Sequence, residues 1–193
     1  MTTSKDDIVI KYFKTPAQFE TWLAKNHAAS TGLYLQIYNK DSGVASLNHA
    51  DALDVALCYG WIDAIAKKYD DQSYLQRFTP RRSKSIWSKR NIEHVERLIK
   101  AGRMKESGLK AIEAAKADGR WDAAYDSPAN SEIPDDFLKL LKKNKSAYQF
   151  FKTLNKTNTF AITWRLQTAK KPETRERRMQ VIIAMLEKGE TFH

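Results

Sequence analysis

The sequence predicts an α+β fold, with a small mixed sheet and helices in the N-terminal half followed by an all-helical C-terminal bundle. Four segments before residue 80 have the alternating or β-rich pattern of strands. After Ser88, by contrast, the apolar residues recur at the three- and four-residue spacing of helices. We therefore expect an α+β domain with a four-strand sheet and flanking helices over residues 1–125, and a helical module over residues 134–193.

The four expected strands are Ile8–Phe13, Gly32–Tyr38, Trp61–Lys68 and Ser73–Thr79. The last two flank a short polar segment and are predicted to pair as a hairpin. If that hairpin turns symmetrically about Asp70, Asp63 lies opposite Arg77, whereas a shift of one residue would remove this pairing.

Capping residues predict where the early helices begin and end. Thr15 and Gln18 have the spacing of a capping box, ahead of a helix that should end near Asn26. Asn48 is placed to cap a second helix, and Gly60 is the expected left-handed residue that ends it. Two later helices should bury the apolar faces formed by Ile92, Val95 and Ile99 and by Leu109, Ile112 and Ala115.

The C-terminal part is expected to form four helices after a polar linker at Asp126–Ile133. Their apolar residues recur at helical spacing, and the last helix shows the clearest pattern, at Met179, Ile182, Ile183 and Leu186. Helices of this length and number predict a small bundle.

Composition and charge favour a folded protein of the cytoplasm. The first fourteen residues lack the apolar run of a secretory signal, and no window is apolar enough to predict insertion into a membrane. The single cysteine, Cys58, excludes an intramolecular disulfide and fits a reducing compartment. The net charge is +10, and residues 134–193 contribute +7 of it, from 13 basic and 6 acidic residues. This charge favours encounters with anionic partners.

Familiar catalytic and cofactor-binding motifs are absent. The sequence contains no GxSxG, phosphate-binding loop, GxGxxG, HExxH or CxxC motif, and its four histidines have no neighbour at metal-ligand spacing. We therefore predict no catalytic set, no metal and no cofactor.

The most unusual stretch is Arg77–Asn91, which holds six basic residues and no acidic one, with Phe78 and Trp87 and three serines interleaved. Because a helix is predicted to open near Ser88, its amide end and the guanidinium groups would converge on a negatively charged group. The alternative is that these arginines pair with surface carboxylates and that Trp87 is a core residue. The candidate anion- or partner-binding residues of this stretch are Arg77, Arg81, Arg82, Ser85, Trp87 and Asn91.

Trp61 and Asp63 form a second candidate region. With Ile65 they are expected to share one sheet face, so the Asp63 carboxylate would lie among bulky residues and would need a partner. Asp63 is accordingly a candidate general base or ligand anchor, and the alternative is a structural ion pair.

In the last helix, Arg175 continues the apolar stripe and Arg178 lies beside it. Arg175 would clamp an acid from the N-terminal half or bind a ligand, although a side chain that extends to solvent at the helix end explains it equally well.

Several long segments resemble the YdeI/OmpD-associated family. They are Ala56–Asp63, Arg77–Ser88 with Asn91, and Asp118–Trp121, and Ala169–Arg178 is similar to the closing motif of that family's OmdA module. The resemblance extends over nearly the whole chain. It implies a bacterial protein linked to bacteriocin protection or to an outer-membrane porin, and it implies no particular reaction or cofactor.

Three functions are compatible with these patterns. The first is a non-enzymatic binding or stress-protection protein with an anionic ligand or a protein as its partner. The second is a nucleic-acid-binding protein, given the basic C-terminal residues and the aromatic residues available for stacking. The third is an enzyme acting on a small acidic or phosphorylated molecule, with Asp63 as base and Arg81 or Arg82 as anion clamp.

Overall fold

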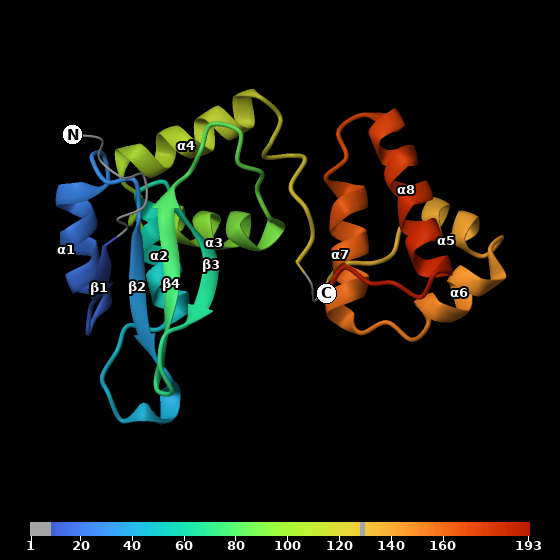
Figure 1. Cartoon of the computed structure of the whole chain (residues 1–193). Helices are drawn as coiled ribbons and strands as arrows, with labels where there is room; N and C mark the ends of the chain where they lie inside the picture. The colour runs from blue at the N-terminus through green and yellow to red at the C-terminus, as the bar shows by residue number, and fades with distance from the viewer. Residues whose placement is uncertain (1–8, 128–129) are drawn as a thin grey trace, which may run out of the picture. The chain divides into compact units, whose positions relative to one another are not determined.

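A computed structural model describes residues 9–127 and 130–193 of the chain (Figure 1). It divides into two compact units. The N-terminal unit comprises the chain up to Ile86 together with Asn91–Ala123, and the C-terminal unit comprises Trp87–Arg90 and Ala124–His193. Strands occur in the first unit only within the described residues, which confirms the predicted α+β class with a helical C-terminal part.

The N-terminal unit contains one four-stranded mixed sheet. Its strands are β1 (Ile10–Tyr12), β2 (Leu33–Tyr38), β3 (Trp61–Lys68) and β4 (Ser73–Pro80), arranged in the order β1-β2-β4-β3. The β1–β2 pair is parallel, and the other two pairs are antiparallel. All four predicted strands are thus present, although the first expected residue, Ile8, lies outside the described part.

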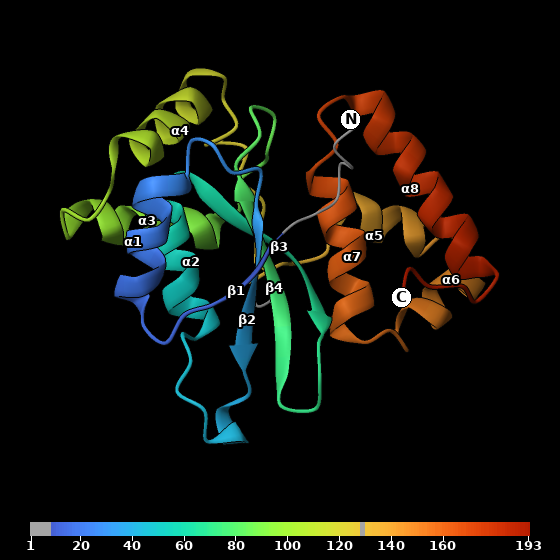
Figure 2. The same cartoon turned by 60° about the vertical axis from the view of Figure 1, so that its left-hand side comes forward.

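Helices cover one face of this sheet (Figure 2). They are α1 (Pro16–Asn26), α2 (His49–Cys58), α3 (Lys89–Lys100) and α4 (Glu106–Ala117), and a short 3-10 turn, η1 (Lys40–Ser42), follows β2. The alternation in β2 places Leu33, Leu35 and Ile37 in the core beneath the helices.

The predicted caps of α1 and α2 are confirmed. Thr15 accepts a hydrogen bond from the amide of Gln18, and Asn48 accepts one from the amide of Asp51. The Gln18 side chain bonds the amide of Lys14, one residue earlier than a regular capping box requires. Gly60 has φ +73° and ends α2 as expected. These local signals hold because each depends on neighbours within one helical turn.

The expected pairing of Asp63 with Arg77 is wrong. Asp63 lies opposite Phe78, whereas Arg77 pairs with Tyr34 of β2 on its other side. The hairpin is centred on Asp71 and not on Asp70, since Lys68 lies opposite Tyr74. A β-bulge between Asp63 and Ala66 then adds one residue on β3, which leaves Asp63 one position away from Arg77. The prediction that Ile65 shares a sheet face with Trp61 and Asp63 is also wrong. Ile65 lies in the bulge and is 67% exposed.

Helices α3 and α4 bury slightly different faces from those predicted. In α3 the buried residues are Val95 and Leu98, and Ile99 faces solvent. In α4 Ile112 and Ala115 are buried as expected, but Leu109 is exposed and Gly108 takes its place. The reason is a close approach of α4 to α2: a Cβ added at Gly108 would lie 2.3 Å from the carbonyl oxygen of Cys58. Only glycine allows the two helices to lie so near.

The C-terminal unit has the four predicted helices, α5 (Asp135–Leu141), α6 (Lys145–Phe151), α7 (Lys156–Gln167) and α8 (Pro172–Glu187). Asn144 and Asn155 cap α6 and α7 through their side-chain oxygens. The helices enclose a core of their own, formed by Phe137, Leu141, Ala147, Ile162, Leu166, Ile182, Ile183 and Leu186. This unit therefore has the apolar interior that a separate fold requires.

Candidate functional site

The basic stretch after β4 forms a compact turn. Arg82 donates its amide to the Ser85 hydroxyl, and Ser85 donates its amide back to the carbonyl of Arg82. The Arg81 guanidinium reaches the carbonyl of Ile86 at 3.4 Å, whereas the Arg82 side chain is exposed. Arg77, in β4, has a buried Nε without a hydrogen-bond partner among the described residues. Within that part of the chain, Arg77 and Arg82 form no ion pair.

The residues at the start of α3 are held by the chain itself. Trp87 is 2% exposed, and its carbonyl accepts a hydrogen bond from the amide of Tyr125. The first amide of the helix, at Lys89, donates to the carbonyl of Tyr125, and the Lys89 ammonium pairs with Asp126 at 2.7 Å. Asn91 follows in the first turn of α3 and is half-buried. The amide and the ammonium group of Lys89, which the predicted anion site would use, are therefore already bound to Tyr125 and Asp126.

Asp63 has a partner that the sequence did not indicate. The Nε2 atom of His49, at the first turn of α2, lies 3.0 Å from Asp63 Oδ2, and both side chains are about one-third exposed. Trp61, two residues earlier in β3, is buried, and its indole nitrogen donates to the carbonyl of His27. The pairing of Asp63 with histidine provides the partner that a carboxylate near bulky side chains needs.

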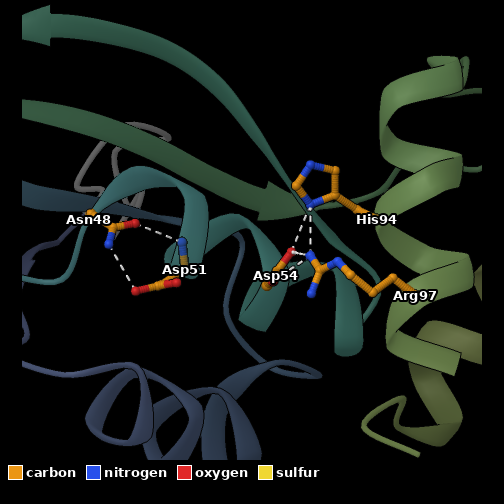
Figure 3. Close-up of polar contacts among 5 residues, drawn as sticks. All are labelled: Asn48, Asp51, Asp54, His94 and Arg97. Carbon is orange, nitrogen blue, oxygen red and sulfur yellow. Dashed lines mark hydrogen bonds and ion pairs between the residues drawn. The ribbon is translucent and has the colours of Figure 1, made fainter. Parts of the chain in front are cut away.

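A more buried polar cluster joins α2 to α3 (Figure 3). Asp54 projects from α2 toward His94 and Arg97, which lie one turn apart on α3. His94 Nδ1 and Arg97 Nη2 both lie 2.7 Å from the carboxylate oxygens. Burial by itself would raise the pKa of Asp54, but hydrogen bonds from Arg97 and His94 outweigh it and lower the pKa below its ordinary value.

This cluster was missed because its members are far apart in the sequence. Asp54 and His94 are separated by 40 residues, so no short spacing in the sequence connects them. Because a carboxylate only accepts hydrogen bonds, Asp54 holds the proton of His94 on Nδ1. The Nε2 atom has no hydrogen-bond partner within the described residues. The bonds that Asp54 accepts from both residues of α3 join the two helices, which is a structural role.

The two candidate arginines of α8 have different roles. Arg175 makes a two-pronged ion pair with Asp136 of α5, so the acid it clamps lies in the same unit and not in the N-terminal half. Arg178 donates to the carbonyl of Arg165 and, at 3.2 Å, to the hydroxyl of Thr168, both near the end of α7. Arg178 therefore joins α8 to the C-terminal end of α7.

Arg178 also lines a pocket of about 490 Å³ in the C-terminal unit. Its lining residues come from α7, from α8 and from the segment after α8. Its lining residues are Trp164, Arg165, Arg177, Arg178, Val181, Ile182 and Phe192. Three of these are arginines and none is acidic.

The guanidinium of Arg165 is fixed in position at this pocket. Its carbon atom lies 3.6 Å from the ring centre of Phe192, and its Nη1 donates to the carbonyl of Ala161 at 3.0 Å. Burial, and next the charge of Arg178, lower the pKa of Arg165. Within the described residues, Arg165, Arg177 and Arg178 form no ion pair with a carboxylate. The pocket thus concentrates positive charge that no carboxylate of the described residues neutralises.

Two other kinds of site receive no support from the described residues. No group of three or more histidine, cysteine, aspartate or glutamate side chains is placed there to bind a metal ion. Each helix in residues 9–127 and 130–193 is too short or too polar to span a bilayer.

Comparison with known families assigns both parts of the chain. A family model described as a domain of unknown function, DUF8412, matches residues 11–111, which is just over half of the chain. A second model, described as Bacteriocin-protection, YdeI or OmpD-Associated and named OmdA, matches residues 130–189. The chain therefore belongs to the DUF8412 family and carries an OmdA domain at its C-terminal end, which confirms the predicted resemblance for that end. No curated protein and no solved structure matches it.

Proposed function

We propose that this protein is a non-enzymatic binding protein of the bacterial cytoplasm and that its OmdA domain holds an anionic ligand or an anionic group of a partner protein. One observation carries the proposal: three arginines line the pocket between α7 and α8, and no carboxylate does. A bound anion would relieve the repulsion between these cations and accept hydrogen bonds from their guanidinium groups. The bacteriocin-protection or porin-associated role in the family's description would then be exercised through this bound group.

Arg177 is the residue that distinguishes binding from structural support. Its side chain is exposed, and it makes no hydrogen bond or ion pair with another described residue. Arg178, by contrast, bonds the end of α7 and would affect stability as well as binding. Arg175 lies two residues earlier on the same helix, but it is paired with Asp136 and is not part of the pocket lining.

The proposal is tested by the melting temperature in increasing inorganic phosphate at constant ionic strength. A ligand that binds only the folded protein raises this temperature in a concentration-dependent way. We expect the rise in the wild type and in Arg175→Gln, the matched control, and its loss in Arg177→Gln. Equal rises in all three proteins, or no rise in any of them, would contradict the proposal.

The basic turn after β4 is tested in the same experiment. Replacing Arg81 and Arg82 together with alanine removes the charges of that turn. We expect the phosphate effect to persist in this double variant. If it disappears there and survives in Arg177→Gln, the anion site lies at the turn and the pocket assignment is wrong.

Nucleic-acid binding is the second candidate, favoured by the net charge of +7 carried by residues 134–193. Binding of a short single-stranded oligonucleotide would then weaken steeply as salt is raised, because bound counterions are released. Affinity that depends on salt in this way and is unchanged in Arg177→Gln would favour nucleic acid over a small anion.

A further inference from the structure

The pocket of the OmdA domain has two chemically different sides. Arg165, Arg177 and Arg178 supply cations, whereas Trp164, Val181, Ile182 and Phe192 supply apolar surface. Val181 is 59% exposed, which is a large exposure for an apolar residue on a helix that packs against others. Resting on the proposed function, we infer that the ligand is an organic anion that carries an aromatic ring, such as an aryl phosphate or an aryl carboxylate.

The size of the pocket is the first argument. A volume of about 490 Å³ falls within the range of pockets that enclose organic molecules and far exceeds what a bare phosphate or sulfate would fill. An inorganic anion in contact with the arginines would leave the apolar side wet. A ligand that fills both sides gains from the burial of its own apolar surface as well as from its charge.

The shape of the pocket wall is the second argument. The guanidinium carbon of Arg165 lies 3.6 Å from the ring centre of Phe192, over the ring. The indole of Trp164, from the residue before it on α7, adds a second aromatic surface to the lining. Planar guanidinium and aromatic groups favour a planar ring over a saturated one, because stacking and cation–π contacts require a flat face.

The inference is tested by isothermal titration calorimetry with phosphate, phenyl phosphate and cyclohexyl phosphate. Each carries a phosphate group, and only the attached group differs. We expect phenyl phosphate to bind roughly tenfold more tightly than cyclohexyl phosphate, and phosphate to bind most weakly. Equal affinities for phenyl phosphate and phosphate would overturn the inference and leave anion binding intact. Absence of binding by all three would instead contradict the proposed function.

Two variants test whether the aromatic ring of the ligand binds at the apolar side of the pocket. Phe192→Leu keeps an apolar side chain but removes the stacked ring, so we expect it to abolish the preference for phenyl over cyclohexyl phosphate while phosphate still binds. Val181→Ser changes an exposed residue and should not alter folding, and we expect it to reduce the affinity for both organic phosphates. An unchanged preference in Phe192→Leu together with unchanged affinities in Val181→Ser would show that the ring does not lie here and would overturn the inference.

Discussion

The Nδ1 atom of His94 lies 2.7 Å from the carboxylate of Asp54, which also accepts both bonds from Arg97. The side chain of Asp54 is 12% exposed, and that of Arg97 is 55% exposed. Asp54 thus provides the buried end of a charge pair whose cation is well solvated. The carboxylate, and not the guanidinium, should dominate the energetic contribution of this contact between α2 and α3.

We predict that Asp54→Asn lowers the free energy of unfolding at neutral pH by about 1–3 kcal/mol, because charge-assisted hydrogen bonds to His94 and Arg97 are lost. Arg97→Gln should cost less, since its side chain is mostly solvated. Guanidinium denaturation monitored by circular dichroism would measure both changes. An Arg97 variant less stable than the Asp54 variant would contradict this interpretation.

The lowered pKa of Asp54 predicts that the stabilisation by this carboxylate depends on pH. The folded pKa of Asp54 lies below its ordinary value of 3.8, so its contribution is present above pH 3.8 and is lost as the pH falls through the folded value. The difference in melting temperature between wild type and Asp54→Asn should therefore be largest near neutral pH and should shrink below pH 3.8. Melting curves of both proteins over this range would reveal the effect, and a difference independent of pH would refute it.

Gly108→Ala should destabilise the N-terminal unit strongly. The added Cβ would meet the carbonyl oxygen of Cys58 at 2.3 Å, so α4 and α2 would have to separate. Overpacking of this kind typically costs about 1–3 kcal/mol and occasionally more.

Gly102→Ala is the matched control for that substitution. Gly102 has φ +65°, and a Cβ added there would come within 4 Å of no described atom outside its chain neighbours, so alanine would cost only the left-handed backbone penalty of about 1–2 kcal/mol. Melting temperatures of the two variants would be compared, and a smaller loss for Gly108→Ala would argue against the close helix packing.

Gln76→Leu should be mildly destabilising although the position is 4% exposed and faces the core. The Gln76 amide donates to the carbonyl of Ala64 at 3.1 Å, inside the β3 bulge. Loss of this bond should cost about 0.5–1.5 kcal/mol, partly offset by the gain in apolar surface. Chemical denaturation would measure the cost, and a clear stabilisation would mean that the bulge does not depend on this contact.

Arg175→Gln should change stability little and leave anion binding intact. Its ion pair with Asp136 is partly solvated, with 26% and 57% of the two side chains exposed, so its loss should cost at most about 1 kcal/mol. Thermal melting and phosphate titration of one preparation would measure both quantities. Weakened phosphate binding would contradict the assignment of Arg175 to a structural role.

Much of the fold was predictable because its signals are local. The caps at Thr15 and Asn48 and the left-handed turn at Gly60 each depend on a few adjacent residues. The register of the hairpin was not, because its turn is centred on Asp71 and not on Asp70, and because a bulge adds one residue on β3 without any glycine or proline to mark it. Ile99 and Leu109 were predicted to be buried but are exposed. Each helix has more apolar residues than its buried face holds, and the packing of the neighbouring helices determines which of them are buried.

The candidate site was predictable only in part. Arg178 was recognised as lying beside the apolar stripe of α8, but its neighbours Arg165 and Phe192 had no pattern to connect them with it. The partners of Asp54 and Asp63 were likewise hidden, since each pairs with a histidine on a different element. The predicted roles of Arg77, Arg81, Arg82, Ser85, Trp87 and Asn91 in binding stay predictions.

By itself, the sequence determined the α+β class, the order of strands and helices, the positive charge of the C-terminal residues and the OmdA resemblance. The first three follow from composition and from periodicities that repeat within one element, whereas the resemblance rests on matching segments such as Ala169–Arg178. Only the tertiary structure decided which side chains meet, because the pairs of Asp54 with His94 and of Arg165 with Phe192 form between segments that packing brings together. The sequence specifies the chemistry of each side chain. A binding site, however, needs side chains within a few ångströms of one another, and those distances are reached only when the helices pack.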